Sequence, residues 1–157
     1  MKEFQQIGDD LLRIARDLIL RDGFLDPVVF VKTPGNLKLI PVQPFLDVNK
    51  EQDKQILSRI IKRFASDHNA SAVYMITEGW IYALSDMNQD YENFQRMTAE
   101  EKQKIRKEVA IVTFRTAAGS CCVKTANINR NNGNAWLDNE SDWFTECESG
   151  LIPKWTE

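Results

Sequence analysis

Histidine and cysteine are scarce in this sequence of 157 residues, which has one His and three Cys. His68 stands alone and Cys121 is followed directly by Cys122, so neither follows the spacing of a zinc site. In a strand, adjacent side chains point to opposite faces, which favours Cys121 and Cys122 as inert, partly buried residues. We therefore predict no metal site and no cofactor.

Glycine is also infrequent, with seven residues that are widely separated along the chain. The glycine-rich patterns that bind phosphate, G-x-x-x-x-G-K-S/T and G-x-G-x-x-G, are missing, and so is the nucleophile pattern G-x-S-x-G. These absences give no support to a nucleotide-binding or serine-hydrolase function. The sequence leaves the question of an enzyme open and inclines against one.

Long apolar runs are missing as well. Charged residues interrupt the first 22 residues, which excludes a signal-peptide core there, and no later run approaches the ~18 residues of a membrane span. An odd number of cysteines, two of them adjacent, is a poor disulfide framework. We expect a protein of the cytoplasm that does not interact with membranes.

Charge is unevenly distributed, although the net charge is only −3. Residues 131–153 contain five acidic residues and no Lys or Arg, whereas the preceding part is slightly basic. Neither part is basic enough to predict nucleic-acid binding. An acidic surface around aromatic residues would suit a basic protein partner.

Apolar spacing and turn residues predict the secondary structure. Residues 3–22 and about 18 residues beginning near Asp47 or Asn49 have the periodicity of amphipathic helices. Turn signals separate the strands expected at 28–32, 37–42, 72–76, 81–84, 109–116, 121–128 and 135–137, with a bulge or bend at Gly79. A capping box at Thr98 and Glu101 predicts a short helix over 99–107, and a helical turn is expected from Ser141 or Asp142 through Cys147.

This order of elements predicts a single α+β domain over residues 1–157. We expect a mainly antiparallel sheet of about five or six strands, with both amphipathic helices packed on one face. Residues 85–107 are polar, which indicates an exposed excursion from the domain.

Glu78 is the most unusual residue, because it lies between the apolar segments AVYMIT and GWIYAL. Such a carboxylate must face solvent, pair with a cation or accept hydrogen bonds. One interpretation is an ion pair with an arginine such as Arg115. The other is a binding site in which Glu78 lines a pocket beside Trp80 and Tyr82.

Tryptophan is concentrated near the end of the chain, and two of these residues, Trp136 and Trp143, are further candidates for binding. Tryptophan is enriched in the residues that dominate protein interfaces. The alternative for Trp143 is that it docks the terminal segment onto the sheet, as apolar side chains usually pack locally.

The sequence from Ser71 to Trp80, SAVYMITEGW, and the later strand EVAIVTFRT resemble small uncharacterised bacterial and phage proteins that share an (S/T)-E-(A/G)-W pattern. This resemblance implies a bacterial or phage origin and no mechanism. Our main hypothesis is a non-enzymatic protein-binding or accessory module that binds another protein or forms a homodimer. The alternative is a carboxylate-based hydrolase, with or without a metal ion, that uses Glu78 with Glu108 or Asp47.

Overall fold

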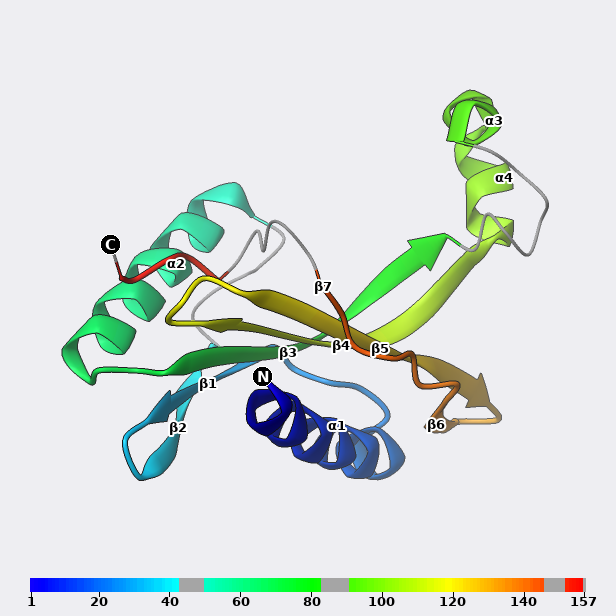
Figure 1. Ribbon diagram of the computed structural model, residues 1–157. Coiled ribbons are helices and arrows are strands. Elements are labelled where there is room, and N and C mark those ends of the chain that lie inside the picture. Colours follow the sequence, from blue (N-terminus) through cyan, green and yellow to red (C-terminus); the bar gives the residue numbers. More distant parts are fainter. Residues whose placement is uncertain (43–49, 83–90, 146–151, 157) are drawn as a thin grey trace.

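The computed structural model describes residues 1–42, 50–82, 91–145 and 152–156, and they form an α+β fold (Figure 1). The elements in chain order are α1 (Lys2–Asp22), β1 (Val28–Thr33), β2 (Asn36–Pro41), α2 (Glu51–Asp67), β3 (Ala72–Tyr82), α3 (Tyr91–Arg96), α4 (Ala99–Lys104), β4 (Arg106–Thr116), β5 (Cys121–Asn131), β6 (Asn134–Asp138) and β7 (Phe144–Thr145).

The strands form one antiparallel sheet in the order β2-β1-β3-β4-β5-β6, with β7 paired to β5. Two tight hairpins were predicted from their turn residues. Gly35 closes β1–β2 with φ of 86°, and Asn132 and Gly133 close β5–β6 with φ of 51° and 81°. These left-handed conformations favour glycine and asparagine, which explains why both turns were visible in the sequence.

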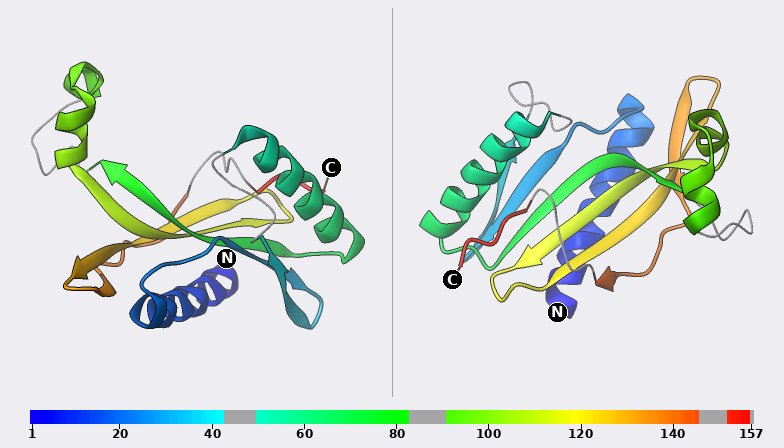
Figure 2. Two further views of the ribbon diagram at one scale, coloured as in Figure 1. Left: turned by 180° about the vertical axis from the view of Figure 1, so that it is seen from behind. Right: turned by 90° about the horizontal axis from the view of Figure 1, so that it is seen from above.

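The two long helices lie on opposite faces of the sheet, so the prediction that both cover one face is wrong (Figures 1 and 2). Helix α1 packs against Tyr74 and Phe114, whereas α2 packs against Val73 and Met75. Alternate residues of β3 therefore enter two different cores. The physical reason was present in β3 itself, because its first five residues, Ala72–Ile76, are all apolar and therefore need cover on both faces of the strand.

Helix α1 follows its apolar periodicity and ends where Gly23 adopts a left-handed conformation, as expected. Helix α2 begins after Lys50, which provides no side-chain cap. The predicted caps Asp47 and Asn49 lie outside the described residues. Among those described, none of the helices combines the length and the apolar character that crossing a bilayer requires.

The polar region after β3 is helical where the structure describes it. Thr98 and Glu101 form the predicted capping box, which begins α4. No residue of α4 is buried, in agreement with the expected exposure, but the excursion ends earlier than predicted because β4 already begins at Arg106.

Two local predictions differ from the structure. Pairing between β3 and β4 continues without a bulge through Gly79, which is opposite Val109. The predicted helical turn from Ser141 or Asp142 is not formed in residues 141–145, where Phe144 and Thr145 instead pair with β5, and its end at Cys147 lies outside the described residues. The backbone of β5 needs hydrogen-bond partners beyond the end of β6, and this segment provides them.

Candidate functional site

The ends of β3 and β4 extend beyond the strands on either side of them. Strand β3 has β1 as a neighbour only as far as Ile76, and β4 has β5 as a neighbour only from Val109 onward. Residues 80–82 and 106–108 therefore form a two-stranded ribbon, in which Tyr82 is opposite Arg106. In Figure 1 this ribbon rises from the rest of the sheet toward α3 and α4.

Large apolar side chains are exposed on this ribbon. Trp80 is 51% exposed and Tyr82 is 41% exposed, and Ile81 between them is exposed as well. The guanidinium carbon of Arg106 lies 3.7 Å from the centre of the Trp80 ring, which is a close cation–π contact. Trp80, Tyr82 and Arg106 lie on one face of the ribbon, opposite to Ile81, and we call these three residues the ribbon surface.

The neighbouring helices are held against this surface by aromatic contacts. The rings of Tyr82 and Phe94 lie 4.8 Å apart at an angle of 57°, which joins α3 to β3. The ammonium group of Lys102 in α4 lies 4.6 Å from the centre of the Phe94 ring. These contacts fix one side of Tyr82, while much of the residue remains accessible to a partner.

Glu78 lies where the ribbon joins the rest of the sheet, and its side chain is 27% exposed. It accepts a hydrogen bond of 2.6 Å from the backbone N–H of Leu25, and its Oε1 lies 3.8 Å from Nη2 of Arg130. The predicted ion pair with an arginine is therefore present, but with Arg130. Arg115 lies on the α2 face, whereas Glu78 is on the α1 face.

Arg130 joins three parts of the fold. Its Nε and Nη2 donate hydrogen bonds of 2.9 and 2.7 Å to the two carboxylate oxygens of Glu108, and its Nη1 donates to the carbonyl of Gly23. The hydrogen bond with Glu108 is the main reason that the pKa of Arg130 is raised above its usual value. This arrangement ties the end of α1 to β4 and β5.

The same contacts bear on the hydrolase alternative. Glu78 and Glu108 approach each other, but the guanidinium of Arg130 lies against both. Within the described part of the chain, no three His, Cys, Asp or Glu residues are grouped as metal ligands. Asp47 lies outside the described residues. The geometry of Glu78 and Glu108 therefore supports an ion-pair network that stabilises the fold.

Replacing Glu78 with leucine is expected to lower the free energy of unfolding by about 1–2 kcal/mol, because the N–H of Leu25 loses its acceptor. Glu78→Gln keeps a carbonyl acceptor and serves as the matched control, with a smaller loss. Urea unfolding of the three proteins measures the difference. Equal stability of Glu78→Leu and the wild type would contradict this assignment.

Trp143 and Trp136, the two other residues predicted to bind a partner, have different surroundings. Trp143 packs on α1, and its Nε1 donates a hydrogen bond of 2.9 Å to Asp9. Its ring also lies at an angle of 62° to that of Phe114, 5.2 Å away. The docking interpretation of Trp143 is therefore the one that the geometry supports. Trp136 lies on edge strand β6, is 38% exposed and belongs to the face opposite Leu137.

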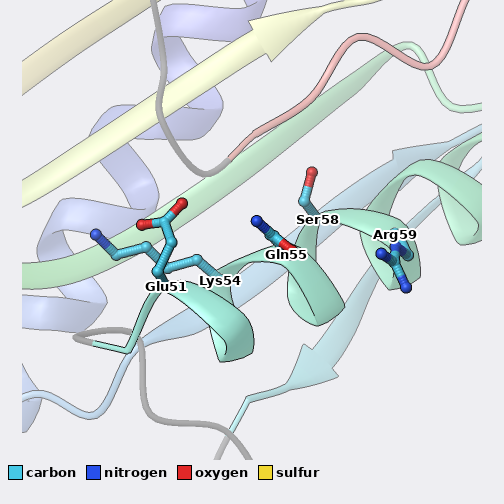
Figure 3. A pocket seen from close by; sticks show the side chains of 5 residues that line it. All are labelled: Glu51, Lys54, Gln55, Ser58 and Arg59. Atoms are coloured by element: carbon cyan, nitrogen blue, oxygen red, sulfur yellow. The ribbon is translucent and has the colours of Figure 1, made fainter.

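Glu78 lines none of the hollows formed by the described residues, although its partner Arg130 lines one of about 270 Å³ at the β5–β6 turn. Another hollow of about 290 Å³ lies on the polar side of α2, and Figure 3 shows its lining side chains. All of the described residues that line it come from α2 itself. A third hollow of about 280 Å³ lies between the β4–β5 turn and residues 154–156.

Comparison with known proteins returned no match: no family model, no curated protein and no solved structure aligns significantly with this chain. The resemblance to small bacterial and phage proteins stays a prediction. Any function has to be inferred from the side chains themselves.

Sequence reasoning found Glu78, Trp80 and Tyr82 but missed Arg106 and Arg130. One signal for Arg106 was available. Antiparallel pairing of β3 with β4 places the end of β3, which contains Trp80 and Tyr82, beside the first residues of β4, which include Arg106. For Arg130 there was no local signal, because its partners Gly23 and Glu108 are 107 and 22 residues away.

Proposed function

We propose that this protein is a non-enzymatic protein-binding module and that the ribbon surface is its binding site. The observation that carries this proposal is the exposure of Trp80 and Tyr82 beside Arg106 on a projecting pair of strands. Tryptophan, tyrosine and arginine are the residues that most often dominate the energy of protein interfaces. Strand pairing also gives the backbone of these residues a defined conformation, which limits the conformational entropy lost on binding.

The proposal includes the cytoplasm as the site of action. Cys121 and Cys122 are buried, Cys122 as a free thiol, and burial raises the pKa of the Cys122 thiol, which favours its protonated form. Free thiols are typical of a reducing compartment.

A second copy of this chain is the other partner to consider. The outer edge of β2 exposes Leu37 and Leu39, which would suit pairing between two sheets. However, Lys38 and Pro41 lie on the same short strand, and an edge lysine and a proline both hinder edge-to-edge pairing. The ribbon surface is therefore favoured over this edge.

Site-specific photo-crosslinking tests the proposal. A photoreactive phenylalanine derivative replaces Tyr82, which lies on the same face of the strand as Trp80, and the protein is irradiated in the cells that produce it. We expect one discrete adduct, which mass spectrometry identifies as another protein or a second copy. Trp80→Ala should abolish the adduct, whereas Trp136→Ala, which removes another exposed tryptophan, should preserve it.

Binding of the purified partner then provides the quantitative test. A tryptophan that acts as a hot spot contributes enough that Trp80→Ala should weaken binding at least about 30-fold. The proposal fails if no adduct forms, or if the adduct forms equally well with Trp80→Ala. Circular dichroism and thermal unfolding of each variant verify that the fold is retained.

A further inference from the structure

We infer that the segment bound by the ribbon surface is acidic and that Arg106 is the residue that recognises its carboxylates. This inference rests on the proposed function and goes beyond it, because it assigns the chemistry of the partner. It also differs from what the acidic end of the chain suggested, which was a basic partner.

The first observation is the charge of the chain around the ribbon. The segment Lys102–Lys107 contains four basic residues and no acidic residue. It runs from α4 into β4 and thus passes beside Trp80 and Tyr82. Glu108 is the next acidic residue along the chain. Both of its carboxylate oxygens already accept hydrogen bonds from the guanidinium group of Arg130. The ribbon surface itself has one charged residue, Arg106, and is therefore positive in a protein whose net charge is −3.

The second observation is that Arg106 contacts the Trp80 ring and forms no salt bridge with a carboxylate of the described residues. Its guanidinium carbon lies over the Trp80 ring at 3.7 Å from the ring centre, which limits the positions that the group can take. Within residues 1–42, 50–82, 91–145 and 152–156, no carboxylate forms a salt bridge with Arg106. A guanidinium has five N–H donors in a planar fork that matches a carboxylate.

Arg130 differs from Arg106, because its guanidinium group donates hydrogen bonds to acceptors within the fold. Its donors are engaged by Glu108 and Gly23, so it stabilises the fold. Arg106 has the same chemistry with its planar group held on an exposed ring. An arginine that is positioned in advance loses less entropy when it binds a carboxylate.

An acidic protein segment fits these observations better than a nucleic acid. Binding of single-stranded nucleic acid requires a continuous basic groove along with aromatic rings on which bases stack. Here Arg106 already occupies a face of the Trp80 ring, and the chain has five acidic residues between positions 138 and 148. Long-range repulsion would oppose a polyanion more than a short acidic peptide.

Peptide display on the full-length protein tests the inference. A library of random 16-residue peptides is selected on the wild type and counter-selected on Trp80→Ala. We expect the selected peptides to be enriched in Asp and Glu. A selected peptide should bind at least about tenfold more weakly when its acidic residues are replaced by Asn and Gln.

Variants of Arg106 provide the second arm. Arg106→Lys keeps the charge but loses the planar fork, so binding of the selected peptide should weaken about tenfold. Arg106→Glu should weaken it further and remove most of its salt dependence. Arg130 is left unchanged because it stabilises the fold, and Trp136→Ala is the matched control that should bind normally.

The outcomes separate the inference from the proposed function. Peptides that require Trp80 but are neutral or basic, or that bind Arg106→Glu normally, overturn the inference and leave a protein-binding site. The absence of any peptide that requires Trp80 overturns both. Binding of poly(U) that requires Trp80 and is tighter than that of every selected peptide also overturns both, in favour of a nucleic-acid site.

Discussion

Replacing Gly8 with alanine is expected to lower the free energy of unfolding by about 1–3 kcal/mol, although alanine is the better residue inside a helix. Gly8 lies in the second turn of α1 and is buried. A Cβ atom at this position would lie 2.5 Å from Cη2 and Cζ2 of Trp143. Carbon atoms cannot approach so closely, so the helix or the indole has to move.

The indole of Trp143 has little freedom to move away. Its Nε1 is hydrogen-bonded to Asp9, and its ring packs against the edge of Phe114 in the core. Asp9 also accepts a hydrogen bond of 2.9 Å from Lys124. Displacing the indole would therefore break a hydrogen bond and an aromatic contact together, which is why the clash should outweigh the gain in helix propensity.

A double-mutant cycle with Trp143→Ala identifies the source of the effect. In the Trp143→Ala background the clash is gone, so Gly8→Ala should stabilise the protein by about 0.5–1 kcal/mol. Urea unfolding of the four proteins gives both values. If Gly8→Ala is destabilising in both backgrounds, the indole does not cause the loss.

Replacing Arg115 with methionine is expected to raise the free energy of unfolding by about 1–3 kcal/mol. Arg115 lies in β4 opposite Val73 and Cys121, and it is only 6% exposed. Its Nε is buried and has no hydrogen-bond partner among the residues that the structure describes. Desolvation of a cationic group without full compensation costs free energy, and a methionine of similar length avoids this cost.

Thermal and urea unfolding measure this gain, and Arg59→Met is the matched control. Arg59 lies on the exposed side of α2, so its replacement should change stability by less than about 0.5 kcal/mol. A loss of stability in Arg115→Met would mean that the folded state compensates the buried guanidinium, and the expectation would then be wrong. Both variants conserve the approximate size of the side chain, which limits the effect of packing.

Most of the helices and turns of this protein can be predicted from its sequence. The apolar periodicity of residues 3–22 specifies α1, and a glycine with positive φ ends it. Turn residues define both tight hairpins, and Thr98 and Glu101 define the start of α4. These signals depend on neighbours within a few residues, so a sequence contains all the information that they need.

The candidate site was only partly predictable. Glu78, Trp80 and Tyr82 are conspicuous because they follow an apolar strand, and the structure shows that the two aromatic residues are indeed exposed. The partners of these residues depend on strand pairing. The register between β3 and β4 brings Arg106 beside Trp80, and α1 and β5 bring Arg130 to Glu78.

The sequence alone determined three features of this protein: the scarcity of histidine, cysteine and glycine, the antiparallel hairpins, and the central apolar strand. Only the tertiary structure decided that α1 and α2 lie on opposite faces, that Trp143 packs on Gly8, and that Arg130 is bound while Arg106 stacks on an exposed ring. The physical reason is distance along the chain. Propensities and turns act over a few residues, whereas burial and ion pairing join residues that only the packed fold brings together.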